Sequence, residues 1–471
     1  MINHLLAWIA HPRPWIAGAV PWSWVLLFLL SPDPLQGQPA DSVRTLTFAE
    51  ARSLLLERSP ELELQRARLQ QSRALSRQAL STFLPSVDLD AFYLDTGFSI
   101  PIQSLLDPGG NGSRLPREGH LEPGDPTDPG PTPRDLDLRV TAIRLQQPLV
   151  NVDGWFARRE TRTMVEAVDH RSRRIHEELE LALLEAYLDA RLARERLDAL
   201  GRGMEAAREA LREAEGLHRE GLAPRLDVLS ARVEMAEVQG ELALARADSV
   251  ASQAVLQRLL DLPAPIDPVE EATLDLLPPL PSLDQALQDI TRRADVEAQL
   301  HAREASTLGR QRARAALWPR LNAFGSYVWI DEDRFFGGGP DLTVGVFLSW
   351  SPFQGMRQVG EIQEAAGRVR EEEARLEALR REAVAEVVSF HARLQGADAE
   401  RAAADEARTA AAEAVELARG LYREQLGTMI QLLDAEARER RAALRQVAAR
   451  HRQVLAAGSY LLASGRWQAH R

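Results

Sequence analysis

The chain has 471 residues, a formal net charge of −12, 57 basic residues that are all arginine, and no cysteine. The absence of lysine and cysteine excludes Schiff-base and P-loop lysine chemistry, thiol nucleophiles, disulfides and cysteine-ligated clusters. The acidic balance argues against a nucleic-acid partner, because surfaces that bind nucleic acid are basic.

Residues 1–40 are predicted to be a cleaved secretory signal. The apolar run from Trp15 to Leu30 is shorter than the roughly 20 residues of a membrane-spanning helix, and a stretch containing Pro, Gly and Gln follows it. The basic flank is thin and no clear cleavage site follows the run, so an uncleaved anchor is the alternative.

The remainder is predicted to consist of two copies of one structural unit, at residues 41–262 and 282–465. Pro85 and Pro319 are 234 positions apart, and later matching positions are 204 apart. The difference arises in a connection, about 96–134, that is rich in Gly, Pro and Asp and is predicted to be a long exposed loop.

Each copy is predicted to begin with helix and to continue into a pair of strands. Past Pro85 and Pro319, apolar residues alternate with small or polar ones, which is the period of a strand with one apolar face. A β-bulge is predicted near Ile143. The predicted strands are about 86–95 and 136–147 in the first copy, and about 320–331 and 341–350 in the second.

A long helical pattern follows each strand pair, at about 154–220 and 357–424. At 1.5 Å per residue, roughly 67 helical residues reach about 100 Å, longer than any compact domain. Helix-breaking residues then predict hairpin tips at about 220–226 and 424–430. These residues are Gly221 and Pro224 in the first tip and Gly427 in the second.

Apolar residues at alternating steps of three and four predict coiled-coil seams on these helices. The seam before the first tip comprises Ala190, Ala193, Leu197, Leu200, Met204, Ala207, Leu211 and Ala214. The seam after it comprises Leu226, Leu229, Val233, Ala236, Gly240, Ala243, Ala247, Val250 and Ala254. The matching positions of the second copy include the charged Arg401, Arg408, Arg440 and His451, so a rotated seam is predicted there, at Ala404, Ala407, Ala411, Ala414, Ala418 and Leu421.

Two further segments complete the chain. Residues 263–281 contain six prolines and are predicted to be a linker that crosses outside the helices. Residues 466–471 are predicted to be a C-terminal tail.

Four strands of this length suit the wall of a membrane β-barrel but cannot close one, so several chains must share a barrel. Two chains supply eight strands and three supply twelve. Aromatic residues where strands meet helices are predicted to form an interfacial girdle, or to fill the join between barrel and helices. They are Phe83, Trp155, Trp318, Trp350 and Phe353.

The ordered set of motifs resembles the TolC-type outer-membrane efflux protein family over about residues 44–465. The motifs are Ser59-Pro60-Glu61-Leu62, FLPSV and LWPRL at the strand starts, QPL at 147–149, and EGLAPRLDVLSA at 220–231, which EQLGTMIQLLDA at 424–435 repeats.

The resemblance implies a mainly α protein with a β-barrel part: a homotrimer with a 12-stranded barrel in the outer membrane and a long helical barrel across the periplasm. It implies an exit duct coupled to an inner-membrane transporter by a periplasmic adaptor protein, in contact with outer-membrane lipid. It implies no enzymatic activity, no cofactor and no metal.

The resemblance also makes the hairpin tips the entrance of the duct. Two acidic gate positions of the family match Gln431 and Asp434, and the basic residue that locks the closed state matches Gly427, so the lock must be built differently here. Asp227 is a further candidate, or a carboxylate that the helix dipole favours; Tyr422 and Arg423 are candidate gate partners. The implied adaptor-docking residues are Gly221, Leu222, Pro224, Leu426, Gly427 and Thr428.

Two other hypotheses account for less of the sequence. A non-conducting periplasmic coiled-coil scaffold explains the seams but not the proline-bounded strands. An enzyme is disfavoured because the ten His residues are dispersed, without a metal-ligand pair such as H-E-x-x-H.

Overall fold

The computed structural model describes residues 44–96, 136–269, 273–331 and 333–467. The predicted signal at 1–40 and the loop that follows Thr96 lie outside these residues. The described residues belong to one unit, which begins at Arg44.

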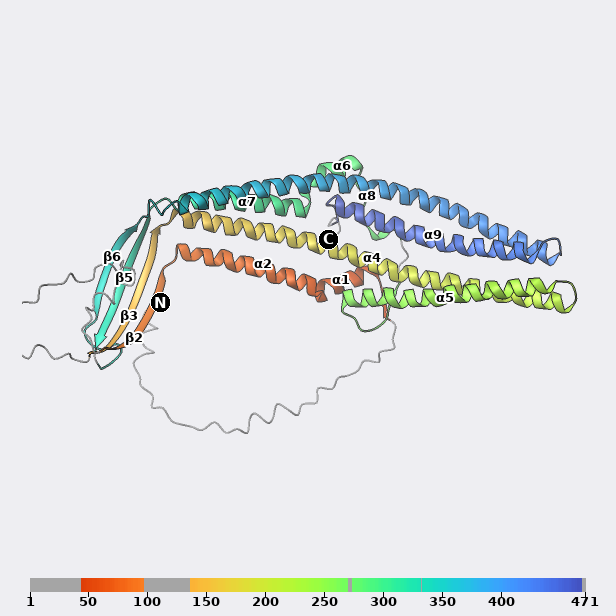
Figure 1. Cartoon of the computed structure of the whole chain (residues 1–471), viewed down its shortest axis with the longest axis horizontal. Helices are drawn as coiled ribbons and strands as arrows, with labels where there is room; N and C mark the ends of the chain where they lie inside the picture. The colour runs from red at the N-terminus through yellow and green to blue at the C-terminus, as the bar shows by residue number, and fades with distance from the viewer. Residues whose placement is uncertain (1–43, 97–135, 270–272, 332, 468–471) are drawn as a thin grey trace, which may run out of the picture. The chain divides into compact units, whose positions relative to one another are not determined.

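Two similar series of elements follow each other along the chain (Figure 1). The first comprises α1 (Phe48–Arg58), α2 (Pro60–Gln78), the 3₁₀ turn η3 (Ala79–Thr82), β2 (Ser86–Thr96), β3 (Leu136–Val150), α4 (Val152–Arg219) and α5 (Arg225–Leu260). The second comprises α6 (Leu283–Asp289), the turn η5 (Ile290–Arg292), α7 (Ala294–Ala315), β5 (Arg320–Asp331), β6 (Asp341–Ser349), α8 (Arg357–Arg423) and α9 (Met429–Ala463).

The helices α4 and α8 are the longest elements, with 68 and 67 residues. Each is about 100 Å long at 1.5 Å per residue. Within this unit the strands lie at one end of the long helices, and the α4–α5 and α8–α9 turns lie at the other (Figure 1). The α4–α5 hairpin packs against the α8–α9 hairpin mainly through α4 and α9.

The strands β2, β3, β5 and β6 form an antiparallel sheet in that order. One face carries exposed apolar side chains on the half nearest the helices: Val87, Leu89, Leu145, Val344, Val346 and Leu348. None of the helices in the described part of the chain combines the length and apolar composition needed to cross a bilayer.

The bulge predicted near Ile143 is wrong. Ile143 pairs in unbroken register with Leu89 on one side and Tyr327 on the other. The irregularity lies between Pro148 and Val150, because proline has no N–H to donate to the neighbouring strand.

The main core lies midway along the long helices, where α1, α4, α5, α8 and α9 meet. Tyr187 and Tyr460 are fully buried there and donate hydrogen bonds to the carbonyls of Leu46 and Pro281, at 2.9 and 3.1 Å. These bonds satisfy the hydroxyl groups that burial removes from water.

The Pro-rich segment contributes to this core instead of only crossing outside the helices. Ile266 is fully buried, and β4 (Ile266–Pro268) pairs in parallel with β1 (Arg44–Leu46). The start of the predicted tail is also packed, since Trp467 is buried and donates a hydrogen bond to Glu180 at 2.6 Å.

The seams differ from prediction in two helices. On α5 the buried stripe includes Val228, Ala231, Val238 and Ala245, whereas the predicted seam is largely exposed, as Val250 shows at 71%. On α9 two charged positions that match the first copy are buried: Arg440 and His451 are 8% and 2% exposed, because ion pairs allow charged residues to occupy the interface. On α8 the predicted rotated seam is only partly covered: Ala404, Ala411 and Ala418 are half-buried, whereas Ala407, Ala414 and Leu421 are exposed.

Candidate functional site

Both hairpin tips are five-residue turns with the same backbone conformation. Gly221 has φ 75° and Gln425, 204 positions later, has φ 60°. The turn therefore needs its left-handed residue at Gln425, and not at the Gly427 that the sequence suggested. Gly427 has a different role: a Cβ there would lie 3.1 Å from the Cβ of Leu421.

The residues after each turn begin the returning helix. Pro224 precedes the first residue of α5 in extended conformation. Thr428 caps α9: its hydroxyl accepts from the Gln431 N–H at 3.3 Å, and its own N–H donates to Gln431 Oε1 at 2.9 Å. Gln431, a predicted gate residue, thus uses its side chain in a capping box.

An apolar cluster joins the two tips. Val228 of α5 packs with Tyr422 of α8 and with Met429 and Leu432 of α9, and all four are buried. This cluster brings the predicted gate residue Tyr422 to the first hairpin.

Tyr422 lies beside Asp227, another predicted gate residue. Burial, together with the negative charges of Asp227 and Glu213, raises the pKa of the Tyr422 hydroxyl to about 12. Burial also raises the pKa of Asp227, an effect that the Tyr422 hydroxyl opposes. The hydroxyl is buried without a hydrogen bond of good geometry, so the contact is chiefly electrostatic.

The remaining predicted gate residues are placed separately. Arg423 pairs with Glu213 of α4 at 3.5 Å. Asp434 lies away from this cluster of contacts, is exposed, and pairs with Arg438 on its own helix at 2.7 Å. The structure therefore brings Asp227, Tyr422 and Arg423 together between the hairpins, and leaves Asp434 on the surface of α9.

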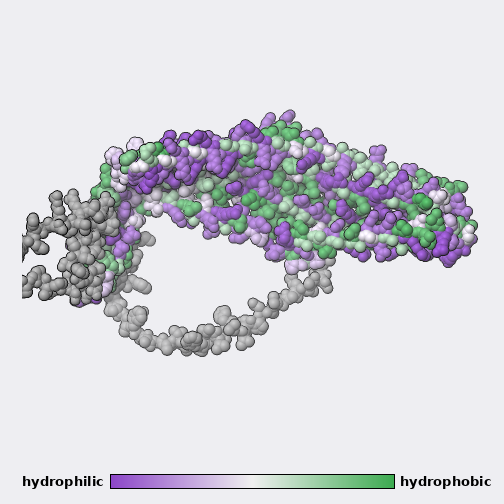
Figure 2. All heavy atoms as spheres, viewed as in Figure 1, coloured by the Kyte–Doolittle hydropathy of each residue, from purple (hydrophilic) through white to green (hydrophobic). Residues whose placement is uncertain are grey.

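The predicted docking residues lie on the exposed turns. Leu222 and Leu426 are 54% and 78% exposed, and the nearby Leu226 and Ile430 are also exposed. Figure 2 shows hydrophobic residues among hydrophilic ones at this end of the unit.

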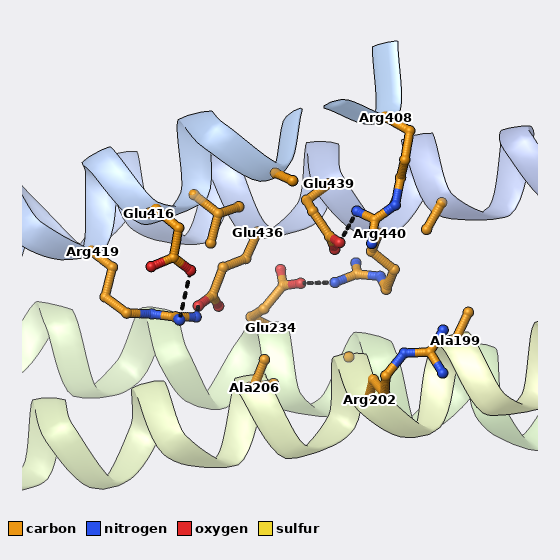
Figure 3. Close-up of a pocket in the computed structure, with 15 residues that line it drawn as sticks. Ala199, Arg202, Ala206, Glu234, Arg408, Glu416, Arg419, Glu436, Glu439 and Arg440 are labelled. Carbon is orange, nitrogen blue, oxygen red and sulfur yellow. Dashed lines mark hydrogen bonds and ion pairs between the residues drawn. The ribbon is translucent and has the colours of Figure 1, made fainter. Parts of the chain in front are cut away.

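A cluster of charged residues between the hairpins was seen in the sequence only as an interruption of the seam (Figure 3). Arg440 of α9 lies 2.8 Å from Glu234 and 3.2 Å from Glu241, both on α5. Arg419 of α8 pairs with the buried Glu436 of α9 at 3.0 Å. Charged residues recurring at seam positions are the signal that could have identified this cluster.

The predicted girdle residues lie where the sheet joins the helices. Phe83 is half-buried; Trp155, Trp318, Trp350 and Phe353 are between 48% and 75% exposed. The Trp350 indole donates to the Leu317 carbonyl at 3.1 Å.

The apolar face of the sheet has a second group of aromatic residues near its far end, which the sequence reading did not single out. Tyr327 and Trp329 contact each other with ring centroids 4.6 Å apart, and the Arg139 guanidinium lies over the Tyr93 ring. Strand registers place Tyr93, Arg139 and Trp329 on neighbouring strands on the same face.

The described residues contain no group of three or more His, Asp or Glu side chains arranged to hold a metal ion. Their charged side chains form ion pairs both within helices, such as Arg191 with Glu195, and between helices, such as Arg440 with Glu234.

Solved structures that share this fold include those of CusC, VceC and MtrE. CusC, solved in a study of folding and transmembrane channel formation, matches with a TM-score of 0.75 at 16% identity over 89% of this chain and 92% of that chain. VceC from Vibrio cholerae matches with a TM-score of 0.70 at 18% identity, over 89% and 96%. The open state of the MtrE channel from Neisseria gonorrhoeae matches with a TM-score of 0.72 at 17% identity, over 89% and 88%.

At these identities the likeness establishes the fold, a TolC-type arrangement of two repeats. None of the curated proteins compared with the chain matches its sequence. The sequence does match the family described as outer membrane efflux protein, over residues 51–261 and 283–463. The two matched segments correspond to the two repeats. The chain therefore belongs to the outer membrane efflux protein family, whose members are outer-membrane proteins.

Proposed function

We propose that three copies of this chain form a channel through the outer membrane that acts as a passive exit duct for exported molecules. The observation that carries the proposal is the four-stranded sheet with an apolar exposed face, whose outer strands β2 and β6 pair on one side only among the described residues. An open edge in lipid leaves backbone groups without hydrogen bonds, so the sheet must be completed by other copies. Three copies supply twelve strands.

Aromatic residues at both ends of the apolar face support the proposal that the sheet spans the membrane. Trp350 lies next to the helices, and Trp329 lies near the far end of β5. Aromatic residues at both levels are typical of a barrel wall that spans a bilayer. The second repeat thus contributes aromatic residues to the interfacial girdle at each end of the sheet.

The exposed stripe on α5 supports the assembly. The stripe is apolar and heptad-spaced, and the part of the chain that the structure describes leaves it exposed, as Leu226, Val233 and Val250 show at 58–71% exposure. We assign it to the contact with a neighbouring copy, whose helices would complete a closed helical barrel. The α5 helix then packs on both sides, once within its own chain and once on its neighbour.

The tips are the gate of the duct in this proposal. Asp227, Tyr422 and Arg423 hold the two hairpins together, and the entrance opens when the hairpins separate. The MtrE relative was solved in an open state, which supports a fold with more than one arrangement of its helices. Asp434, on the exposed surface of α9, and Gln431 are the residues that we expect to face the entrance.

The partners proposed are a periplasmic adaptor protein and an inner-membrane transporter. The exposed apolar turns, with Leu222 and Leu426 at their ends, suit a protein partner. In this proposal the chain is a passive channel and catalyses no reaction.

The assembly is tested by expressing the full chain, fractionating the membranes and measuring the mass of the detergent-solubilised protein. We expect recovery in the outer-membrane fraction, extraction only by detergent, and the mass of three chains. A monomer in the soluble fraction would instead support the coiled-coil scaffold.

A further inference from the structure

The face of the sheet opposite the apolar one carries two aromatic side chains on the half nearest the helices. Strand register places Phe324 of β5 and Phe347 of β6 on this face, beside the polar residues Gln146, Asn322 and Ser326. Side chains alternate between the two faces of a strand, and a membrane barrel turns its apolar face to lipid and its polar face to the lumen. In the proposed channel, both phenylalanines therefore face the lumen.

The two rings pack against each other across neighbouring strands. Phe324 lies directly opposite Gly345, and Phe347 lies opposite Asn322, so the two phenylalanines are diagonal neighbours on β5 and β6. Their ring centroids are 5.9 Å apart and the rings are tilted by 59°, which is within the range of favourable aromatic pairs. The two side chains therefore form one aromatic surface.

Gly345 leaves the space that the Phe324 ring occupies. A Cβ at position 345 would lie 2.8 Å from Cε1 and 2.9 Å from Cζ of that ring, closer than two carbon atoms can pack. A glycine inside a strand often marks such a close approach. The far end of the ring thus lies over β6, and the ring leans along the wall of the sheet.

Both rings remain accessible in spite of this packing. Phe324 and Phe347 are 36% and 39% exposed. An aromatic ring that stays in water forgoes the free energy that burial would supply. A molecule that passes along the wall can cover these rings and recover part of that free energy.

Acidic side chains give the same face a surplus of negative charge. Asp90 pairs with Arg144 at 3.4 Å, and the Arg320 guanidinium donates two hydrogen bonds to an aspartate of α4. Asp88 and Asp341 are exposed and have no ion pair among the described residues. Negative charge along a channel wall attracts cations, and the face of an aromatic ring attracts a cation as well.

The rings lie near the end of the sheet that joins the helices. Phe324 is close to the start of β5 at Arg320, and Phe347 is close to the end of β6 at Ser349, where the sheet meets α7 and α8 (Figure 1). Three copies related by a threefold axis keep each residue at the same height. They would place three such aromatic pairs around the lumen, at the level where a molecule enters the barrel from the helical part.

We propose that Phe324 and Phe347 form a luminal belt that binds aromatic groups of exported molecules and favours those that carry a positive charge. The belt is a contact site on the wall of the duct and determines which solutes are retained there. This inference rests on the proposed channel function, because the two residues face a lumen only in a closed barrel.

The luminal belt is tested by single-channel recording of the full-length protein in planar bilayers, with two organic cations of similar size as blockers. Benzyltriethylammonium carries an aromatic ring and tetrapropylammonium does not. We expect benzyltriethylammonium to block the current at a lower concentration. The double variant Phe324→Ser, Phe347→Ser should raise the blocking concentration of benzyltriethylammonium by about threefold or more, and should change that of tetrapropylammonium much less.

Tyr327→Ser is the matched control. Tyr327 lies on the same strand and is 37% exposed, but it belongs to the apolar face of the sheet, so its removal should leave the block by both cations unchanged. The double variant Asp88→Asn, Asp341→Asn should weaken the block by both cations alike, because it removes charge and keeps the rings.

Two further double variants separate binding from folding. Phe324→Tyr with Phe347→Tyr keeps the rings and should keep the preference for the aromatic cation. Phe324→Leu with Phe347→Leu keeps the apolar packing of the strands and should reduce the preference, even where the serine variant does not assemble.

The outcomes distinguish the luminal belt from the channel itself. If the leucine or serine variant assembles as three chains, conducts, and retains the full preference for benzyltriethylammonium, the belt is overturned while the channel function stands. An unchanged protein that conducts and is blocked equally by both cations overturns the belt as well. If the unchanged protein and all variants insert but never conduct, the channel function fails and the belt fails with it.

Discussion

Arg423, in the last turn of α8, places its Nε 3.5 Å from the Glu213 carboxylate of α4. This pair joins the two hairpins immediately beside Tyr422, which packs against Val228 of the first hairpin. Ionic and apolar contacts therefore act together at the tips, and each can be removed by itself.

The exposed pair should contribute little to stability and measurably to gating. Arg423→Gln and Glu213→Gln should each change the free energy of unfolding by about 0.5 kcal/mol or less, while modestly increasing channel open time. In a double-mutant cycle the two changes should be less than additive. Full additivity of the open-time effects would show that Arg423 does not act through Glu213.

Asp434 tests the acidic gate that the family resemblance implied. Asp434→Ala should raise the conductance or weaken block by multivalent cations, because a carboxylate at the entrance attracts cations. Since Asp434 pairs with Arg438 at 2.7 Å, Arg438→Gln is the control for the loss of that pair. Unchanged conductance and unchanged block in Asp434→Ala would remove Asp434 from the gate.

The buried cluster around Arg293 should make the protein sensitive to acid. Burial alone would raise the pKa of Asp295, but the hydrogen bonds and positive charge of Arg293, with Arg174 and the Val296 N–H, outweigh it and hold that pKa below its ordinary value. The ionised Asp295 therefore stabilises the fold fully at a pH above the ordinary pKa of aspartate. This stabilisation is lost as the pH falls through the lowered pKa of the folded protein.

The variant Asp295→Asn should therefore unfold more easily at neutral pH, by about 2 kcal/mol, and should lose part of the decline in stability at low pH. Denaturant titrations followed by helical circular dichroism between about pH 6 and pH 2 measure both effects. An equal decline in both proteins would show that other carboxylates set the acid limit.

The exposed stripe of α5 should be required for assembly. Val250→Arg places a charge on the stripe and should yield monomers or dimers with unchanged helix content, because Val250 is 71% exposed within its own chain. Asp248→Arg introduces the same residue at an exposed position beside the stripe and should leave three chains together. A trimeric Val250→Arg variant would place the interface elsewhere.

Much of the architecture could be predicted from the period of the apolar residues, because a change from helical spacing to alternation marks a strand. Which stripe packs within the chain could not. On α5 both the Val228 stripe and the Val250 stripe have heptad spacing, and only the neighbouring helices decide which one is covered. Similarly, Arg440 looked like an interruption of the seam, because its partners Glu234 and Glu241 lie about 200 positions away in the sequence.

The turn at the second tip is another feature that the sequence did not predict correctly. Gly427 was the natural choice for the left-handed residue, yet Gln425 occupies that position. The first tip places Gly221 there, so the equivalence of the two turns, and not the nearest glycine, was the better guide.

The channel is tested most directly by recording from a planar bilayer to which the detergent-purified full-length protein has been added. Stepwise ionic currents that require insertion of the assembled protein are the expected result. A protein that inserts as an assembly of three chains and passes no current would contradict an exit duct.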